Sequence, residues 1–177
     1  MPDQGFSLLQ LIITLAVASV LLSIGIPRWG YLVGQNLIAT ERQQFSALLQ
    51  FARQTAVMQG QMITLCASQD MTQCRSDHQF WHTGYMVFAD TNGNKQREAN
   101  EVLLRVNEAA RTGVLIQTSS GRKAIRYRTD GSAWGSNVTV RFCTQNHPTL
   151  NRALIVHGSG RIRLSDTLSN GKPVTCE

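Results

Sequence analysis

The chain has 177 residues, of which 42% are hydrophobic and 16% charged, a composition that excludes a disordered protein and leaves room for one folded domain but not two. The formal net charge is +6, yet residues 1–110 carry 7 Lys and Arg against 8 Asp and Glu, whereas residues 111–177 carry 10 against 3. Basic charge concentrated in the last third indicates an acidic or polyanionic partner.

The first predicted element is an apolar stretch from Phe6 to Ile26, with 21 consecutive residues free of Asp, Glu, Lys and Arg. As a helix rising about 1.5 Å per residue it would span about 31 Å, the thickness of the hydrocarbon core of a bilayer. It is too long for the apolar core of a cleaved secretory signal, and no small-residue cleavage site follows it. We therefore expect it to stay attached to the mature protein, as an anchor in lipid or in an equally apolar environment.

An amphipathic helical pattern follows. Pro27 lacks a backbone donor and crowds the carbonyl of Ser23, so a bend or local melting is expected there. From Tyr31 to about Gln59, apolar residues recur at three- and four-residue steps, with polar residues on much of the other face. Gly60 marks the expected end of this helix. We interpret the apolar stripe as a face packed on the protein's own domain.

Beyond the helix, the pattern changes to short strands separated by turn residues. No segment of helical period interrupts them, so the sheets should be largely antiparallel. Turns are marked by Asn92-Gly93, Asp130-Gly131 and Gly158-Ser159-Gly160. The predicted strands are Met62–Ser68, Tyr85–Asp90, Val102–Val106, Val114–Thr118, Ala124–Arg128, Asn137–Cys143, Arg152–His157 and Arg161–Leu164.

All four cysteines lie beyond the apolar stretch. An even number in an exported domain indicates disulfides, although sequence alone permits three pairings. We favour Cys66–Cys74, which closes a short loop, and Cys143–Cys176, which ties the C-terminal tail to a strand. A four-cysteine zinc site is the competing interpretation, but no two cysteines have the usual C-x₂₋₄-C spacing.

The start of the chain, Gly5-Phe6-Ser7-Leu8-Leu9, resembles the prepilin peptidase site of type IV pilins and type II secretion pseudopilins, and Pro27 matches a proline of their helices. The resemblance implies cleavage after Gly5, methylation of the new N-terminal Phe6 and retention of the apolar helix. The chain departs from the family in having Gln10 where a glutamate is usual, so a hydrogen bond to a neighbour's ammonium would lose its charge-assisted part. The leader also lacks the usual basic residue, so the positive-inside rule does not orient the chain.

A second resemblance covers most of the remaining chain. The segments Cys66…Cys74, Trp81–Asp90, Asn92-Gly93-Asn94 and Glu101–Leu104 are similar to those of the GspH/FimT family of pseudopilins. It implies an α+β fold in which a long N-terminal helix packs on an antiparallel β-sandwich. The expected organisation is a leader at residues 1–5, a transmembrane or filament-core helix at 6–27, its amphipathic continuation at 28–60, and a periplasmic β domain at 61–177.

The C-terminal sequence Gly160-Arg161-Ile162-Arg163 resembles the Gly-Arg-x-Arg motif of FimT-type minor pilins, which bind DNA in natural transformation. Two arginines two residues apart on a strand share a face, and their planar forks can hold phosphate oxygens. Arg152, Lys172 and Arg141 are expected nearby if Cys143–Cys176 forms. The glycine would let the backbone approach a phosphate. The competing interpretation is a solvated strand edge, on which basic residues discourage edge-to-edge pairing.

These expectations describe a minor pilin or pseudopilin with its β domain in the periplasm. Its expected partners are other pilin subunits, prepilin peptidase, the inner membrane and the backbone of double-stranded DNA. The alternative is a purely structural initiation or tip subunit of a type IV pilus or type II secretion system, without DNA binding. A third possibility, a single-pass membrane protein unrelated to pilins, predicts that residues 1–5 stay uncleaved.

Other candidate sites are weaker. The segment Asp90–Glu101 partly resembles a calcium loop, but Lys95 stands where that loop needs glycine, so we interpret it as a turn-rich hairpin loop. His78 and His82, with Asp77, have no third anchored ligand, and His147 and His157 are isolated, so no metal or other cofactor is expected. No catalytic set is found, and the protein is predicted not to be an enzyme. Trp81, Tyr85 and Phe88 are assigned to the core and not to base stacking.

Overall fold

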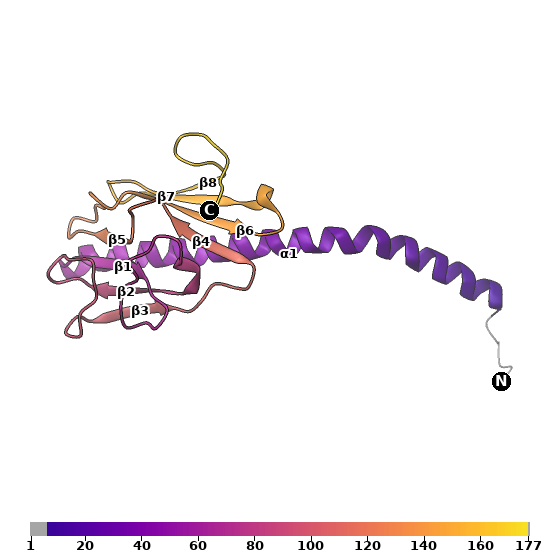
Figure 1. The fold of residues 1–177 in the computed structure, drawn as a ribbon, viewed down its shortest axis with the longest axis horizontal. Coiled ribbons are helices and arrows are strands. Elements are labelled where there is room, and N and C mark those ends of the chain that lie inside the picture. Colours follow the sequence, from indigo (N-terminus) through magenta and orange to yellow (C-terminus); the bar gives the residue numbers. More distant parts are fainter. Residues whose placement is uncertain (1–6, 177) are drawn as a thin grey trace.

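The computed structural model describes residues 7–176, with side chains for all of these except residues 24–28. A single helix, α1, runs from Leu8 to Gln59 over 52 residues and reaches from the far end of the molecule into the β domain (Figure 1). It ends at Gly60, whose φ of 62° is left-handed, as the sequence predicts. Of the two outcomes expected at Pro27, local melting does not occur, because α1 is continuous through this position. The other outcome, a bend, agrees with the curvature of the N-terminal half of α1 (Figure 1).

The start of α1 is held by its own chain. The Ser7 amide donates to Oε1 of Gln10 at 3.1 Å, the backward bond of a capping box. The predicted cleavage and methylation site, Gly5 and Phe6, lies outside the described residues. Over the part of the chain that the structure describes, no helix combines the length and the apolarity needed to cross a membrane.

The β domain contains two four-stranded antiparallel sheets (Figure 1). All eight predicted strands are present, each within one residue of its predicted bounds. In the first sheet, with order β3-β2-β1-β5, the strands are β1 Ile63–Ala67, β2 Tyr85–Ala89, β3 Leu103–Asn107 and β5 Ala124–Tyr127. In the second, with order β4-β6-β7-β8, they are β4 Val114–Thr118, β6 Val138–Thr144, β7 Arg152–Val156 and β8 Ile162–Ser165. Two short 3₁₀ helices, η1 Trp81–Thr83 and η2 Pro148–Leu150, lie in the connections.

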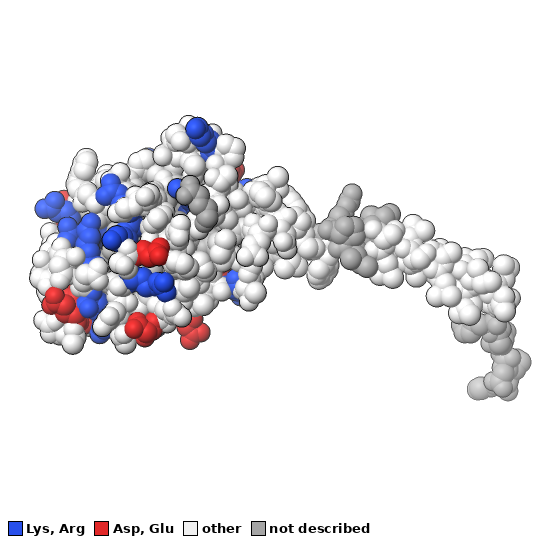
Figure 2. Space-filling view, in the orientation of Figure 1, with Lys and Arg blue, Asp and Glu red and all other residues white. Residues whose placement is uncertain are grey.

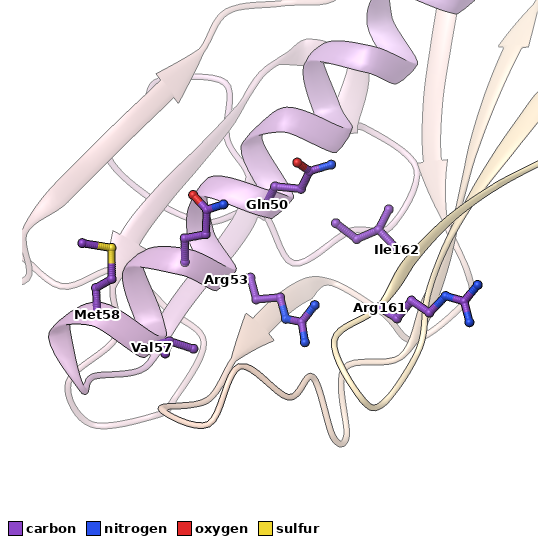
Figure 3. Close-up of a pocket in the computed structure, with 7 residues that line it drawn as sticks. Gln50, Arg53, Val57, Met58, Arg161 and Ile162 are labelled. Carbon is purple, nitrogen blue, oxygen red and sulfur yellow. The ribbon is translucent and has the colours of Figure 1, made fainter.

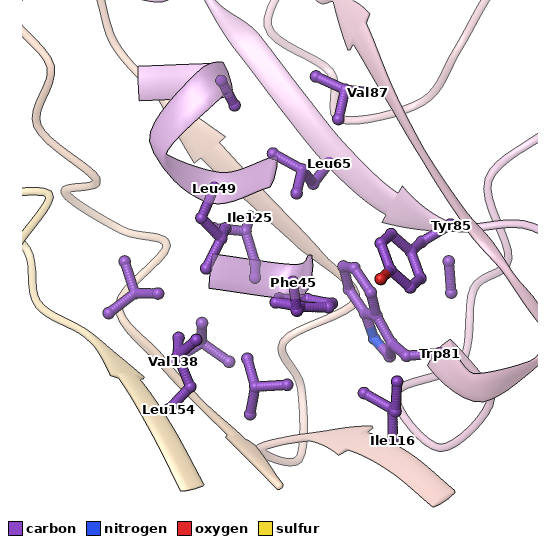
Figure 4. Packing of buried hydrophobic residues seen from close by; sticks show 14 of the residues in the cluster. Phe45, Leu49, Leu65, Trp81, Tyr85, Val87, Ile116, Ile125, Val138 and Leu154 are labelled. Atoms are coloured by element: carbon purple, nitrogen blue, oxygen red, sulfur yellow. The ribbon is translucent and has the colours of Figure 1, made fainter. Parts of the chain in front are cut away.

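One hydrophobic core joins α1 to the inner faces of both sheets. Phe45 of α1 is fully buried at its centre, with its ring 4.9 Å from that of Tyr85, 5.6 Å from Trp81 and 5.7 Å from Phe142 (Figure 4). Trp81, Tyr85 and Phe88 are each fully buried, which confirms that they are core residues. The stripe of α1 that enters the core consists of Ile38, Phe45, Leu49, Ala52 and Ala56. The prediction that this stripe packs on the protein's own domain is therefore confirmed.

The two favoured disulfides are present in the structure. Cys66 of β1 is bonded to Cys74, and Cys143 of β6 is bonded to Cys176 in the C-terminal tail. The second bond holds the loop after β8 against the outer face of the second sheet, where Val174 packs on Ala153 and Cys143. It therefore decides where the last residues of the chain lie relative to the predicted basic site.

Candidate nucleic-acid interface

The predicted site lies on the β7–β8 hairpin. The strands are joined by Gly158-Ser159-Gly160, with the Gly160 amide donating to the carbonyl of His157 at 2.8 Å and the His157 amide donating to the carbonyl of Arg161 at 2.9 Å. Gly160 has a φ of +79°, so the loop is a three-residue hairpin that ends in a left-handed glycine. This geometry places His157, directly after β7, opposite Arg161, directly before β8.

Gly160 packs against the chain itself. A Cβ placed on it would lie 2.0 Å from the carbonyl oxygen of Gly131, and the same oxygen accepts a hydrogen bond from Nε of Arg53 at 3.0 Å. Arg53 of α1 also donates to the Ser159 carbonyl at 3.3 Å. The close approach that the sequence suggested for a phosphate is thus made by the Gly131 turn, and the glycine of the motif has a structural reason of its own.

The two arginines of the motif are exposed and share a face of the second sheet. Arg163 is opposite Ile155 in the register of β7 and β8, and Arg161 precedes it by two residues, so both side chains lie on the side of Ile155. Figure 3 shows Arg161 pointing away from α1, while Ile162 points toward the helix. Ile162 and Arg161 also line an open groove against the end of α1, with Gln50, Arg53, Val57 and Met58 (Figure 3).

Arg152 lies on the opposite face of the sheet. It lies two and four residues before the core residues Leu154 and Val156 and therefore shares their face. Its Nε is 3.1 Å from Oδ1 of Asp166, which also lies 4.0 Å from Arg42 of α1. Its Nη1 donates to two backbone carbonyls at 2.9 and 2.8 Å. Sequence reasoning expected Arg152 near Arg161 if Cys143–Cys176 forms. The disulfide is present, but Arg152 and Arg161 lie on opposite faces of the sheet.

The C-terminal loop carries Lys172, which is exposed, over the outer side of the second sheet. Arg141 lies on that outer face as well, and its Nη1 donates to the carbonyl of Thr175 at 3.1 Å. The structure thus brings Arg161 and Arg163 together, leaves Lys172 on a neighbouring loop of the same side, and places Arg152 elsewhere.

Comparison with known proteins identifies the family of this fold. A family model described as type II transport protein GspH matches residues 41–160, which contain most of the helix stripe and both sheets up to the β7–β8 turn. The chain belongs to the GspH family. Because this is a family of transport proteins, the protein is not an enzyme.

Solved structures with this fold include the type IV minor pilin FimU of Pseudomonas aeruginosa, with a TM-score of 0.62 and 22% identity over 80% of this chain and 96% of FimU. A second crystal form of FimU gives a TM-score of 0.56 at 22% identity, covering 76% and 96% of the two chains. The minor pseudopilin EpsH of the type 2 secretion system of Vibrio cholerae gives 0.49 at 14% identity, covering 76% and 98%. No curated protein sequence matches significantly. The FimU likeness confirms the predicted α+β, pilin-like fold.

This member of the GspH family also has a basic cluster that sequence reasoning missed. Arg122 donates to the carbonyl of Gly135 at 3.0 Å and to Oδ1 of Asn137 at 3.3 Å, and Nζ of Lys95 lies 3.4 Å from the same Gly135 carbonyl. Burial, followed by the charges of Arg126 and Arg122, lowers the pKa of Lys95. Figure 2 shows most of the basic side chains on the left half of the β body in this view, with acidic side chains among them.

Beside this cluster, Trp134 is 67% exposed and lines an open groove with His157, a residue that is isolated in the sequence. The sequence contains one indication of this exposed ring: Trp134 lies inside the turn-rich segment Ser132–Ser136, where no strand pattern would bury it. Nothing in the sequence pairs His157 with Trp134, because only the fold brings the two loops together.

The remaining candidates have structural explanations. In the Asp90–Glu101 loop, Glu101 accepts from the amides of Thr91 and Glu98 at 2.8 and 3.1 Å, and Asp90 accepts from the amide of Lys95 at 3.2 Å. These carboxylates therefore hold the loop's own backbone. Within residues 7–176, no group of three His, Cys, Asp or Glu side chains is placed to hold a metal ion.

Proposed function

We propose that the chain is a minor pilin or pseudopilin whose helix packs between the helices of neighbouring subunits in a filament. The observation that carries this role is the apolar surface of α1 outside the β domain. From Leu8 to Leu22 its large apolar side chains are 52 to 74% exposed, and the core begins only at Ile38. So large a continuous apolar surface is a site of association, and helices of other subunits have the matching shape.

Before assembly, the same surface would lie in the inner membrane with the β domain in the periplasm. The stretch that supports this, Phe6 to Ile26, extends at both ends beyond the side chains that the structure describes. Intact-mass analysis of the protein from its native membrane tests the first step. We expect loss of residues 1–5 and a methylated Phe6, and an unprocessed Met1 would contradict the pilin role.

Within the filament, we propose that the outer face of the second sheet binds the backbone of DNA through Arg161 and Arg163. Three facts support this. Both side chains are exposed, and they share one face. Neither is in an ion pair, because among residues 7–176 the only carboxylate in an ion pair is Asp166, which contacts Arg42 and Arg152. Contacts of this kind hold phosphates without reading bases, so the capture of DNA for natural transformation would be independent of its sequence. Retraction of the filament would then draw the DNA inward.

The test is a titration of duplex DNA with residues 34–177, followed by fluorescence anisotropy at several salt concentrations. Removal of residues 1–33 leaves the core whole, because none of the described side chains before Gly34 is buried. We expect binding that is independent of sequence and falls with salt at a logarithmic slope of about −0.9 per phosphate contacted. Arg161→Ala with Arg163→Ala should weaken binding to all sequences alike and reduce the slope by about 1 per lost contact.

The matched control removes the same two charges elsewhere. Arg105 on β3 and Arg111 before β4 are exposed and lie at sheet edges away from β8. Their double alanine variant should keep most of the binding. If the parent protein fails to bind duplex DNA even at low salt, DNA capture is refuted and the chain is a structural subunit of the filament. One observation favours that alternative: Arg152, a predicted DNA contact, is paired with Asp166.

A further inference from the structure

An open groove of about 550 Å³ runs along the outer face of the second sheet beside the arginine pair. Its walls come from four places in the sequence: the loop after β4, the loop before β6 with the start of β6, the end of β7, and the loop after β8. The side chains with polar or aromatic chemistry that line it include Ser119, Arg122, Trp134, Asn137, His157 and Ser169. None of them belongs to the Gly-Arg-x-Arg motif.

Trp134 is presented as a fixed, exposed surface. One side of its indole lies on the backbone of Gly158, where an added Cβ would be 3.0 Å from Cε3 and 3.1 Å from Cζ3. The flanking backbone is held because the Ala133 amide donates to the Gly158 carbonyl and the Ser136 amide donates to the Ala133 carbonyl, each at 2.8 Å. The ring is nevertheless 67% exposed, whereas Trp81 is fully buried in the core.

One cationic side chain, Arg122, lines the same groove as this ring. Arg122 is oriented by its bonds to Gly135 and Asn137, the residues that directly follow the Trp134 turn, and it retains further N–H donors. Lys95 reaches the same Gly135 carbonyl. A nucleic-acid strand lying in the groove would therefore meet the fixed positive charge of Arg122 close to Trp134.

The arginine pair continues this surface. Thr139 of β6, Ile155 of β7 and Arg163 of β8 are aligned across the sheet by register, and Thr139 and Ile155 both line the groove. Directly opposed residues have Cβ atoms about 5 Å apart, so Arg163 stands at the groove's edge. The opposed pair His157 and Arg161 forms the next row toward the hairpin. One continuous path thus runs from the two arginines past His157 to Trp134.

We propose that this groove binds an unpaired stretch of DNA, with one base stacked on Trp134 and its phosphates held by Arg163, Arg161 and Arg122. The proposal rests on the proposed function and names the form of DNA that the site prefers. In a duplex the faces of the bases are covered by their neighbours, so an exposed indole gains nothing from them. A single strand offers the base face and the phosphate together.

The test compares a single-stranded oligothymidine with a duplex, both titrated into residues 34–177. This fragment lacks Trp29, so Trp134 is its only exposed tryptophan. Stacking should quench its fluorescence on addition of the single strand. Trp134→Ala should weaken oligothymidine binding on the order of tenfold to a hundredfold while changing duplex binding less than twofold, and Trp134→Phe, which keeps a ring, should retain most of the affinity.

The outcomes separate the two proposals. If duplex DNA binds with the expected salt slope but Trp134→Ala leaves oligothymidine affinity unchanged, base stacking is refuted and backbone capture by Arg161 and Arg163 stands. Equal loss of duplex and single-strand binding in Trp134→Ala would also overturn the stacking proposal, since the ring would then serve the backbone site. If neither DNA binds, both proposals fail. A circular dichroism spectrum of each variant identical to that of the parent establishes that the fold is intact.

Discussion

Replacement of Gly160 by alanine tests whether the glycine of the motif serves the fold. Its φ of +79° is left-handed, and an alanine there costs about 1–2 kcal/mol. In addition, the new Cβ would lie 2.0 Å from the Gly131 carbonyl oxygen, a backbone atom that is itself held by Arg53. Relief requires the two turns to separate, and overpacking of this kind costs about 1–3 kcal/mol more.

Gly171 offers a matched control. Its φ is +80°, almost the same as that of Gly160, but nothing lies within 4 Å of an added Cβ. Gly171→Ala should therefore carry only the conformational cost. Urea unfolding of residues 34–177, followed by circular dichroism, should show Gly160→Ala less stable than Gly171→Ala by about 1–3 kcal/mol. At about 2–4 °C per kcal/mol for a domain of this size, the difference in Tm is several degrees.

The reasoning is refuted if the two variants are equally stable, because the Gly131 contact would then have no energetic consequence. The result also bears on DNA binding. Suppose that Gly160→Ala is destabilised by less than expected and yet loses more DNA affinity than Arg161→Ala does. The backbone at Gly160 would then approach the phosphate after all. Affinity measured well below the Tm of each variant separates these effects.

Two further predictions concern pH. Hydrogen bonds, first among them the one from the Thr72 amide, lower the pKa of Asp70. The stabilisation that the Asp70 carboxylate gives the Cys66–Cys74 loop is therefore present above the ordinary aspartate pKa and is lost as pH falls below that value. A carboxyl titration by NMR should find the pKa of Asp70 well below the usual range, and an ordinary pKa would contradict the loop geometry. Burial raises the pKa of both Tyr85 and Tyr127, and the charge of Glu41 adds a smaller increase at Tyr85. The contribution of these two buried phenols to stability is therefore complete below pH ~10 and is lost as pH rises further. Residues 34–177 contain no other tyrosine, so phenolate absorbance should appear together with loss of the circular dichroism signal, and full ionisation of an intact fold would contradict the burial.

Much of the fold follows from local patterns. Each strand was predictable within one residue because alternation of apolar side chains and glycine-containing turns are properties of a few consecutive residues. The same is true of the end of α1 at Gly60. The local pattern predicts one long helix but leaves open whether it bends or melts at Pro27, since that outcome depends on the surrounding turns.

The candidate site, too, was predictable in part from local sequence and in part was not. The sequence by itself determined that Arg161 and Arg163 share a face, because strand residues two apart always do, and that the last third of the chain is basic. Only the tertiary structure decided that Arg152 points to the other side, that Gly160 packs on Gly131, and that Trp134 stands beside His157. These are relations between residues brought together by the register of the sheet and the packing of separate loops. Such contacts depend on the whole chain at once, and no short stretch of sequence contains them.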